Sequence, residues 1–126
     1  MKTNLAITSI LGLTAVILGA FAAHALKERL SVEALQSLET AILYQMFHVL
    51  ALLFVNTFHA ISLQSKNLVS YFFFAGILFF SGSIYAIYLL NIPASSIWFI
   101  TPLGGFLLIL GWLALFISIL KISKKV

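Results

Sequence analysis

Four apolar stretches dominate the sequence, and each is long enough to cross a lipid bilayer as a helix, which takes roughly 20 residues. They run from Leu5 to Leu26, from Ala41 to Leu63, from Leu68 to Leu90 and from Ile97 to Leu120. Backbone groups inside a bilayer must be hydrogen-bonded within each segment, which favours helices over strands. The polar breaks between the stretches are short, so neighbouring helices should run antiparallel. We therefore predict an all-α integral membrane protein, a four-helix bundle in which residues 1–126 form a single membrane domain.

The composition supports this class of protein and excludes several kinds of chemistry. Hydrophobic residues make up 63% of the chain and charged residues 8%, whereas charged residues are about 25% of a typical soluble domain. The sequence contains no cysteine and no aspartate, which excludes disulfides, thiolate metal sites and cysteine nucleophiles. We expect no cofactor and no metal ion.

The first stretch has an alternative interpretation. Lys2, an apolar run and the small residues of AFAA or AHA together resemble a secretory signal peptide with a cleavage site. The apolar run is longer than the roughly 7–15 residues of a usual signal core. We therefore predict that the stretch is a membrane helix.

The distribution of basic residues predicts the orientation of the chain. Four spans put both termini and the middle loop on one side of the membrane. That side carries Lys2, Lys66, Lys121, Lys124 and Lys125, while the other side carries Lys27, Arg29 and every glutamate. Basic residues collect on the cytoplasmic side, so both termini of this multi-pass protein of the cell membrane are predicted to be cytoplasmic. The lysines near the C-terminus are typical of a helix anchored at a membrane surface, so no nucleic-acid partner is predicted.

The second stretch carries a polar seam. Gln45, His48, Asn56 and His59 fall within one arc of about 80° on a helix. Polar side chains are costly against lipid, so the seam should face the bundle interior or a wet cavity, with Tyr44 at its margin. Ser31 is predicted to cap an amphipathic extension that continues into the span.

Small residues recur at helical spacing in the first and fourth stretches. They are Gly12, Ala15, Gly19, Ala22 and Ala23 in the first, and Thr101, Gly104, Gly111 and Ser118 in the fourth. Such stripes let helix backbones approach closely, so we interpret them as packing surfaces. The same faces are compatible with a homo-oligomer.

Several polar residues are predicted to converge in the outer half of the bundle. His24 lies near the outer end of the first helix, and His48 lies roughly 10 Å below the same surface. Thr101 is predicted to cap the fourth helix and Pro102 to begin it, so that its positive end aims toward both histidines. The candidate ligand-binding residues are His24, Tyr44, Gln45, His48, Ser81, Tyr85 and Thr101. The alternatives are a simple proline kink, and a His24 that only bonds a nearby carbonyl.

Four sequence blocks resemble a known family over essentially the whole chain. GAFAAHAL, LETA followed by YQMFHVLALL, FFSGSIY, and TPLGG followed by GW are similar, in this order, to the blocks of the membrane proteins called domain of unknown function 423, or UPF0382. The animal transmembrane protein 256 is a relative. The first block has Ala22 where the family commonly has glycine. The resemblance implies a four-span protein of the cell membrane and no particular activity.

Enzyme function finds little support in the sequence. Glu28, Glu33 and Glu39 lie in or beside a loop expected among lipid headgroups, and Glu39 is on the opposite side of its helix from His48. A haem held between two histidines is also disfavoured, because His24 and His48 differ in depth. We predict a binding or transport-type bundle in the lipid bilayer, which takes a lipid or a small polar ligand at the outer polar cluster. A structural or assembly role without a ligand is the alternative.

Overall fold

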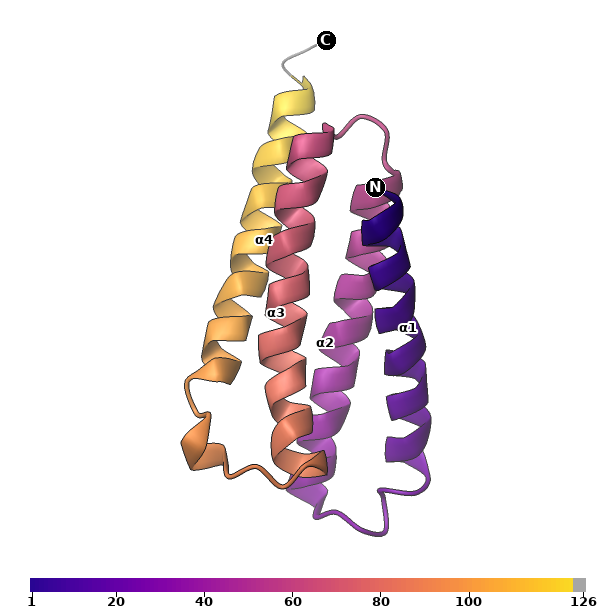
Figure 1. Cartoon of the computed structure of the whole chain (residues 1–126), viewed down its shortest axis with the longest axis vertical. Coiled ribbons are helices and arrows are strands. Elements are labelled where there is room, and N and C mark those ends of the chain that lie inside the picture. Colours follow the sequence, from indigo (N-terminus) through magenta and orange to yellow (C-terminus); the bar gives the residue numbers. More distant parts are fainter. Residues whose placement is uncertain (124–126) are drawn as a thin grey trace.

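The computed structural model describes residues 1–123 and is helical throughout the membrane-crossing part of the chain (Figure 1). Its α-helices, in the described range, are α1 (Lys2–Ala23), α2 (Val32–Thr57), α3 (Leu63–Leu89) and α4 (Ile100–Ser123), with a short 3-10 helix, η1 (Ala94–Ser96), before α4. Each α-helix is long and apolar enough to cross a membrane. The predicted all-α bundle is confirmed.

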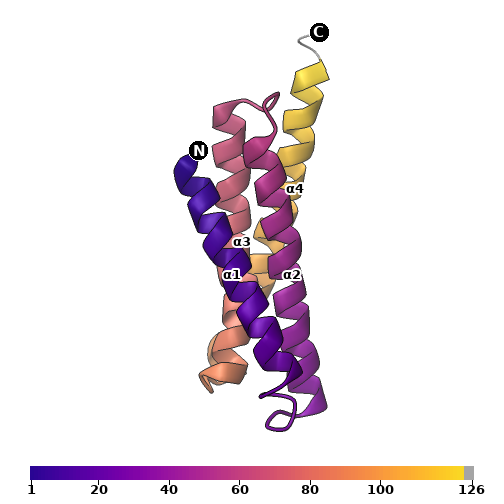
Figure 2. The same cartoon turned by 90° about the vertical axis from the view of Figure 1, so that its right-hand side faces the viewer.

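The helices pack in chain order. α1 packs on α2, α2 on α3 and α3 on α4, and Figures 1 and 2 show α1 and α4 at opposite edges of the bundle. The N-terminus, the loop between α2 and α3 and the C-terminal end of α4 lie at one end, which we call the terminal end. Lys124 and Lys125 lie outside the described residues, and which side of the membrane the terminal end faces stays a prediction.

The core lies where α2, α3 and α4 meet. Its buried side chains include Leu52, Val55, Val69, Phe73, Ile77 and Leu108. The predicted glycine stripe of α4 faces α3, because a Cβ atom on Gly104 would lie 2.1 Å from the backbone nitrogen of Phe80, and one on Gly111 would lie 2.5 Å from the Phe73 ring. Only glycine allows α3 and α4 to approach this closely.

Three helices begin earlier than the apolar stretches indicate, and the first of them, α1, begins at Lys2 rather than Leu5. α2 begins at Val32 rather than Ala41, and its predicted cap is confirmed, because Ser31 Oγ accepts a hydrogen bond from the Ala34 backbone N–H (3.2 Å). α3 begins at Leu63 rather than Leu68, and Ser62 caps it by accepting from the Ser65 N–H (3.2 Å). A serine cap satisfies the free amides at a helix start, so α2 and α3 continue beyond the apolar run.

Other helix ends also differ from the prediction, including that of α4, which extends to Ser123 rather than Leu120. α1 ends at Ala23 rather than Leu26, and α2 ends at Thr57, which leaves His59 exposed in the following loop. α4 begins at Ile100, and the Phe99 carbonyl accepts from the Leu103 N–H (3.2 Å). Pro102 therefore lies within the first turn, where a missing N–H removes no helical bond, and Thr101 is not the cap.

Candidate functional site

Gln45 and Tyr85, two of the predicted site residues, are directly hydrogen-bonded. Gln45 is 2% exposed. Its amide group donates to the Leu11 carbonyl (2.7 Å) and to Thr14 Oγ1 (3.0 Å), while the Tyr85 hydroxyl donates to its Oε1 atom (2.8 Å). The side chain thus joins α1, α2 and α3 through bonds that are sheltered from lipid.

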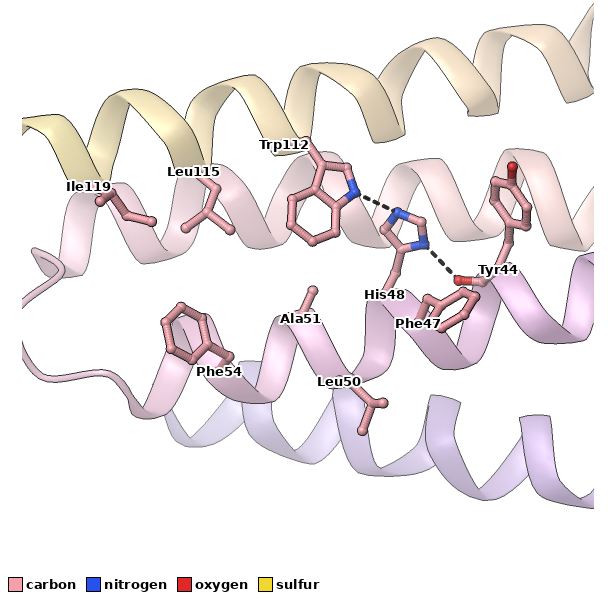
Figure 3. A pocket seen from close by; sticks show the side chains of 9 residues that line it. All are labelled: Tyr44, Phe47, His48, Leu50, Ala51, Phe54, Trp112, Leu115 and Ile119. Carbon is pink, nitrogen blue, oxygen red and sulfur yellow. Dashed lines mark hydrogen bonds between the residues drawn. The ribbon is translucent and has the colours of Figure 1, made fainter.

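His48 lies at the middle of the bundle and is hydrogen-bonded to a residue of α4. The indole Nε1 of Trp112 donates to His48 Nε2 (3.0 Å), and His48 Nδ1 is 2.6 Å from the Tyr44 carbonyl oxygen (Figure 3). An indole N–H can only donate, so Nε2 is the acceptor and Nδ1 carries the ring hydrogen. Both ring nitrogens are therefore used in bonds within the protein.

Ser81 and Thr101 each connect neighbouring helices. The Ser81 hydroxyl, which is fully buried, donates to the Ala41 carbonyl on α2 (2.7 Å). Thr101 Oγ1 shares a hydrogen bond with Ser83 Oγ on α3. Within residues 1–123, every buried side-chain nitrogen and oxygen has a hydrogen-bond partner, so these polar groups hold the helices together.

The predicted convergence of His24 with His48 is wrong. His24 follows the last residue of α1 and is exposed. A Cβ atom on Gly12 would lie 3.3 Å from Val49, the neighbour of His48, and His24 lies about 18 Å further along α1 than Gly12. The predicted depth of His48 was counted from Ala41, but α2 begins at Val32. His48 is therefore further from the start of its helix than was predicted. Thr101 is similarly remote, at about 16 Å along α4 from Trp112.

A groove lies between α2 and α4, and we call it the α2–α4 groove. Its volume is about 590 Å³ and its walls are almost entirely apolar. Figure 3 shows its lining side chains, which are Tyr44, Phe47, His48, Leu50, Ala51, Phe54, Trp112, Leu115 and Ile119. The Tyr44 ring also stacks on Phe80 at 4.8 Å between ring centroids. Tyr44 and His48 are the predicted site residues that line this groove.

The remaining groove residues were not predicted from the sequence. Phe47, Ala51 and Phe54 on α2 recur at helical spacing, as do Trp112, Leu115 and Ile119 on α4. This spacing is also that of any lipid-facing stripe, so the pattern predicts no groove. Trp112 was a weak indication of a polar contact between helices, because a buried indole N–H usually finds a hydrogen-bond partner.

A second polar cluster, also missed, lies near the terminal end. Asn4 Nδ2 on α1 donates to Oδ1 of Asn56 and to Oδ1 of Asn67 (3.1 Å each), and Asn56 Nδ2 donates to Ser70 Oγ (2.9 Å). Lys66, which is only 6% exposed, donates through Nζ to the Asn56 carbonyl (3.1 Å). The cluster ties the start of α1 to the α2–α3 hairpin, and Lys66 is a packed residue rather than a surface anchor.

Comparison with known proteins identifies the family. A sequence model of the family described as "Protein of unknown function (DUF423)" matches residues 18–105. The chain belongs to this family. The match includes His24, Gln45, His48 and Thr101 and ends before Trp112, so it contains the α2 side of the groove but not the α4 residues that line it.

Several UPF0382 membrane proteins resemble the chain over nearly its whole length. The UPF0382 membrane protein of Staphylococcus saprophyticus is 41% identical, covering 97% of this chain and 100% of its own. The UPF0382 membrane protein YwdK of Bacillus subtilis is 38% identical, covering 96% and 98%. The UPF0382 membrane protein of Haemophilus influenzae is 41% identical, covering 88% of each chain. No solved structure matches.

Family membership and the apolar helices together define the protein class. This member of the DUF423 family is a multi-pass protein of the cell membrane. The names of its relatives state no activity. Among the described residues, no group of three histidine or glutamate side chains is placed to hold a metal ion.

Proposed function

We propose that the protein binds a lipid-type molecule within the membrane and holds one of its hydrocarbon chains in the α2–α4 groove. The observation that carries the proposal is the groove itself, about 590 Å³ in volume with walls that are almost entirely apolar. Ligand sites are typically concave and mostly apolar, with a few placed polar groups. Here the polar atoms of His48 and Trp112 are bonded to each other, so the groove offers a hydrocarbon chain an almost wholly apolar wall.

The dimensions of the groove suit one chain in one leaflet. Its α2 wall extends from Tyr44 to Phe54, which is about 15 Å along a helix. Half of a bilayer's hydrocarbon core is also about 15 Å thick. Phe54 is near the terminal end of α2 and His48 is at the middle of the bundle, so most of a bound chain would lie in the leaflet at the terminal end.

The same geometry favours a lipid over a small polar ligand. The polar side chains of the predicted outer cluster bond to one another or to backbone carbonyls across helices. A polar solute would have to break such bonds to enter, and a buried group left without a partner costs about 1–3 kcal/mol. A hydrocarbon chain in the α2–α4 groove breaks none of them.

Trp112 provides the test, because it lines the groove and is 49% exposed. In a Trp98→Phe background, Trp112 is the remaining tryptophan, and phospholipid with brominated chains quenches its fluorescence on contact. The experiment adds brominated phosphatidylcholine to the purified protein in detergent micelles. A bound chain predicts quenching that saturates at stoichiometric lipid.

Two matched variants separate groove binding from general lipid contact. Ala51→Phe fills the groove wall and should remove the saturable quenching, whereas Ala6→Phe, on the exposed face of α1, should leave it unchanged. Circular dichroism checks that both variants keep their helices. Quenching that grows only in proportion to bulk lipid, and equally in both variants, would contradict the proposal and favour a structural or assembly role.

A further inference from the structure

We propose that the chain in the α2–α4 groove belongs to an anionic phospholipid, and that its phosphate group occupies a small polar pocket beside Lys121. This inference rests on the proposed function and names the chemical class of the ligand. The protein would then bind anionic lipids selectively in the leaflet at the terminal end.

The polar pocket begins where the groove ends. We call it the terminal pocket; its volume is about 120 Å³, and its lining residues are Ala60, Ser62, Ser65, Ser118, Lys121 and Ile122. On α4, Ser118 directly precedes Ile119, a groove residue, and Ile122 is within one turn of it. Figure 3 shows Phe54 and Ile119 at the end of the groove next to the α2–α3 loop, which contributes Ala60 and Ser62 to the terminal pocket.

The side chains of the terminal pocket suit a phosphate. Lys121 is exposed in the last turn of α4 and supplies an ammonium group. The Ser62 hydroxyl donates to Ser65 Oγ (3.0 Å), which leaves the Ser65 hydroxyl its own hydrogen to donate. The Ser118 hydroxyl donates to the Ala114 carbonyl (2.7 Å), so the lysine ammonium and the Ser65 hydroxyl are the donors left for phosphate oxygens.

The charge distribution favours an anionic lipid over a zwitterionic one. Glu28, Glu33 and Glu39 are the only acidic residues of the sequence, and they lie in the loop between α1 and α2 or in the first part of α2. That end of the bundle is away from the termini (Figure 1). Among the described residues, the lining of the terminal pocket therefore has a lysine and no carboxylate to offset it or to attract the choline or amine of a zwitterionic headgroup. Its size and position, at the level where a bilayer's headgroups lie, suit the phosphate of the lipid whose chain fills the groove.

The experiment compares headgroups with the same brominated chains. Brominated phosphatidylglycerol and brominated phosphatidylcholine are titrated separately into the Trp98→Phe protein in neutral detergent. We expect saturable quenching of Trp112 by both lipids, with about fivefold tighter binding of phosphatidylglycerol, the factor for about one lysine at a charged membrane surface. Added salt should weaken this preference because the Lys121 ammonium is exposed.

Lysine variants locate the source of the preference. Lys121→Gln should abolish it and Lys121→Arg should retain it, whereas Lys2→Gln, which removes an exposed charge at the same end but outside the terminal pocket, should leave it unchanged. Equal affinities for the two lipids, or a preference that survives Lys121→Gln, would overturn this inference and leave the groove proposal standing. The loss of saturable quenching with both lipids would overturn the two proposals together.

Discussion

Replacing Gly104 with alanine should separate α4 from α3. Gly104 faces the α3 backbone, and a Cβ atom placed there would lie 2.1 Å from the Phe80 nitrogen and 2.6 Å from the Phe79 carbonyl carbon. Both atoms belong to the helix backbone, so no side-chain rotation relieves the clash. The two helices must move apart along the face that also packs Gly111 against Phe73.

The magnitude follows from two opposing terms. Overpacking costs about 1–3 kcal/mol, and the backbone obstacle puts Gly104→Ala at about 3 kcal/mol. Alanine has the higher helix propensity, by about 1 kcal/mol, so the net loss is about 2 kcal/mol. Gly105→Ala is the matched control, because its Cβ would lie 3.7 Å from the Phe80 ring, an ordinary contact. The control should be neutral or more stable by up to about 1 kcal/mol.

Equilibrium unfolding measures this difference. The purified variants, in mild detergent, are titrated with sodium dodecyl sulfate and followed by far-ultraviolet circular dichroism. We expect Gly104→Ala to unfold at clearly lower dodecyl sulfate than Gly105→Ala. Equal unfolding midpoints would refute the close approach of α4 to α3 and, with it, the position of the α4 wall of the groove.

Three further predictions test the polar network and the orientation. Tyr85→Phe removes the donor to Gln45 Oε1 and should cost about 1 kcal/mol in the same unfolding assay, whereas Tyr88→Phe should cost little; equal effects would mean that the bond contributes nothing. Trp112→Phe leaves its histidine acceptor without a donor and should cost about 1–3 kcal/mol, more than Trp98→Phe on an exposed indole; the reverse order would be evidence against this bond. A reporter enzyme that is active only outside the cell, fused to the C-terminus, should give no signal, because the basic residues predict cytoplasmic termini; strong activity would reverse the orientation.

The helices and the inward-facing residues of α2 could be predicted from the sequence. Length and hydropathy determine which segments cross a bilayer. Gln45, His48 and Asn56 are buried as their seam predicts, because a polar side chain against lipid costs more than any packing alternative. Ser31 was recognisable as a cap because it directly precedes an amphipathic run.

The depth of each residue could not be predicted in the same way. The relative position of His24 and His48 depends on which residue of α1 opposes which residue of α2, and that register is determined by contacts such as Gly12 with Val49. Hydropathy alone carries no register information. It also places helix starts at the first apolar residue, whereas the capped starts at Val32 and Leu63 lie outside the apolar runs.

The groove could not be predicted because its walls have the composition of a lipid-facing surface. Phe47, Ala51 and Phe54 would look the same in sequence whether they faced bulk lipid or a concave site. The sequence also could not show whether Lys66 and Asn67 are packed inside the bundle or exposed, since polar residues near a helix end usually lie among headgroups. Their contacts with Asn56 and Asn4 depend on the tertiary packing of α1 against the hairpin.

A high-resolution density map of the protein in a lipid nanodisc containing phosphatidylglycerol tests the central claim most directly. We predict continuous density for one hydrocarbon chain along the α2–α4 groove, beside Ala51 and Trp112, ending in a headgroup near Lys121. A groove filled by a helix of a second copy, or closed by Trp112 and Phe54 packing across it, would contradict the account.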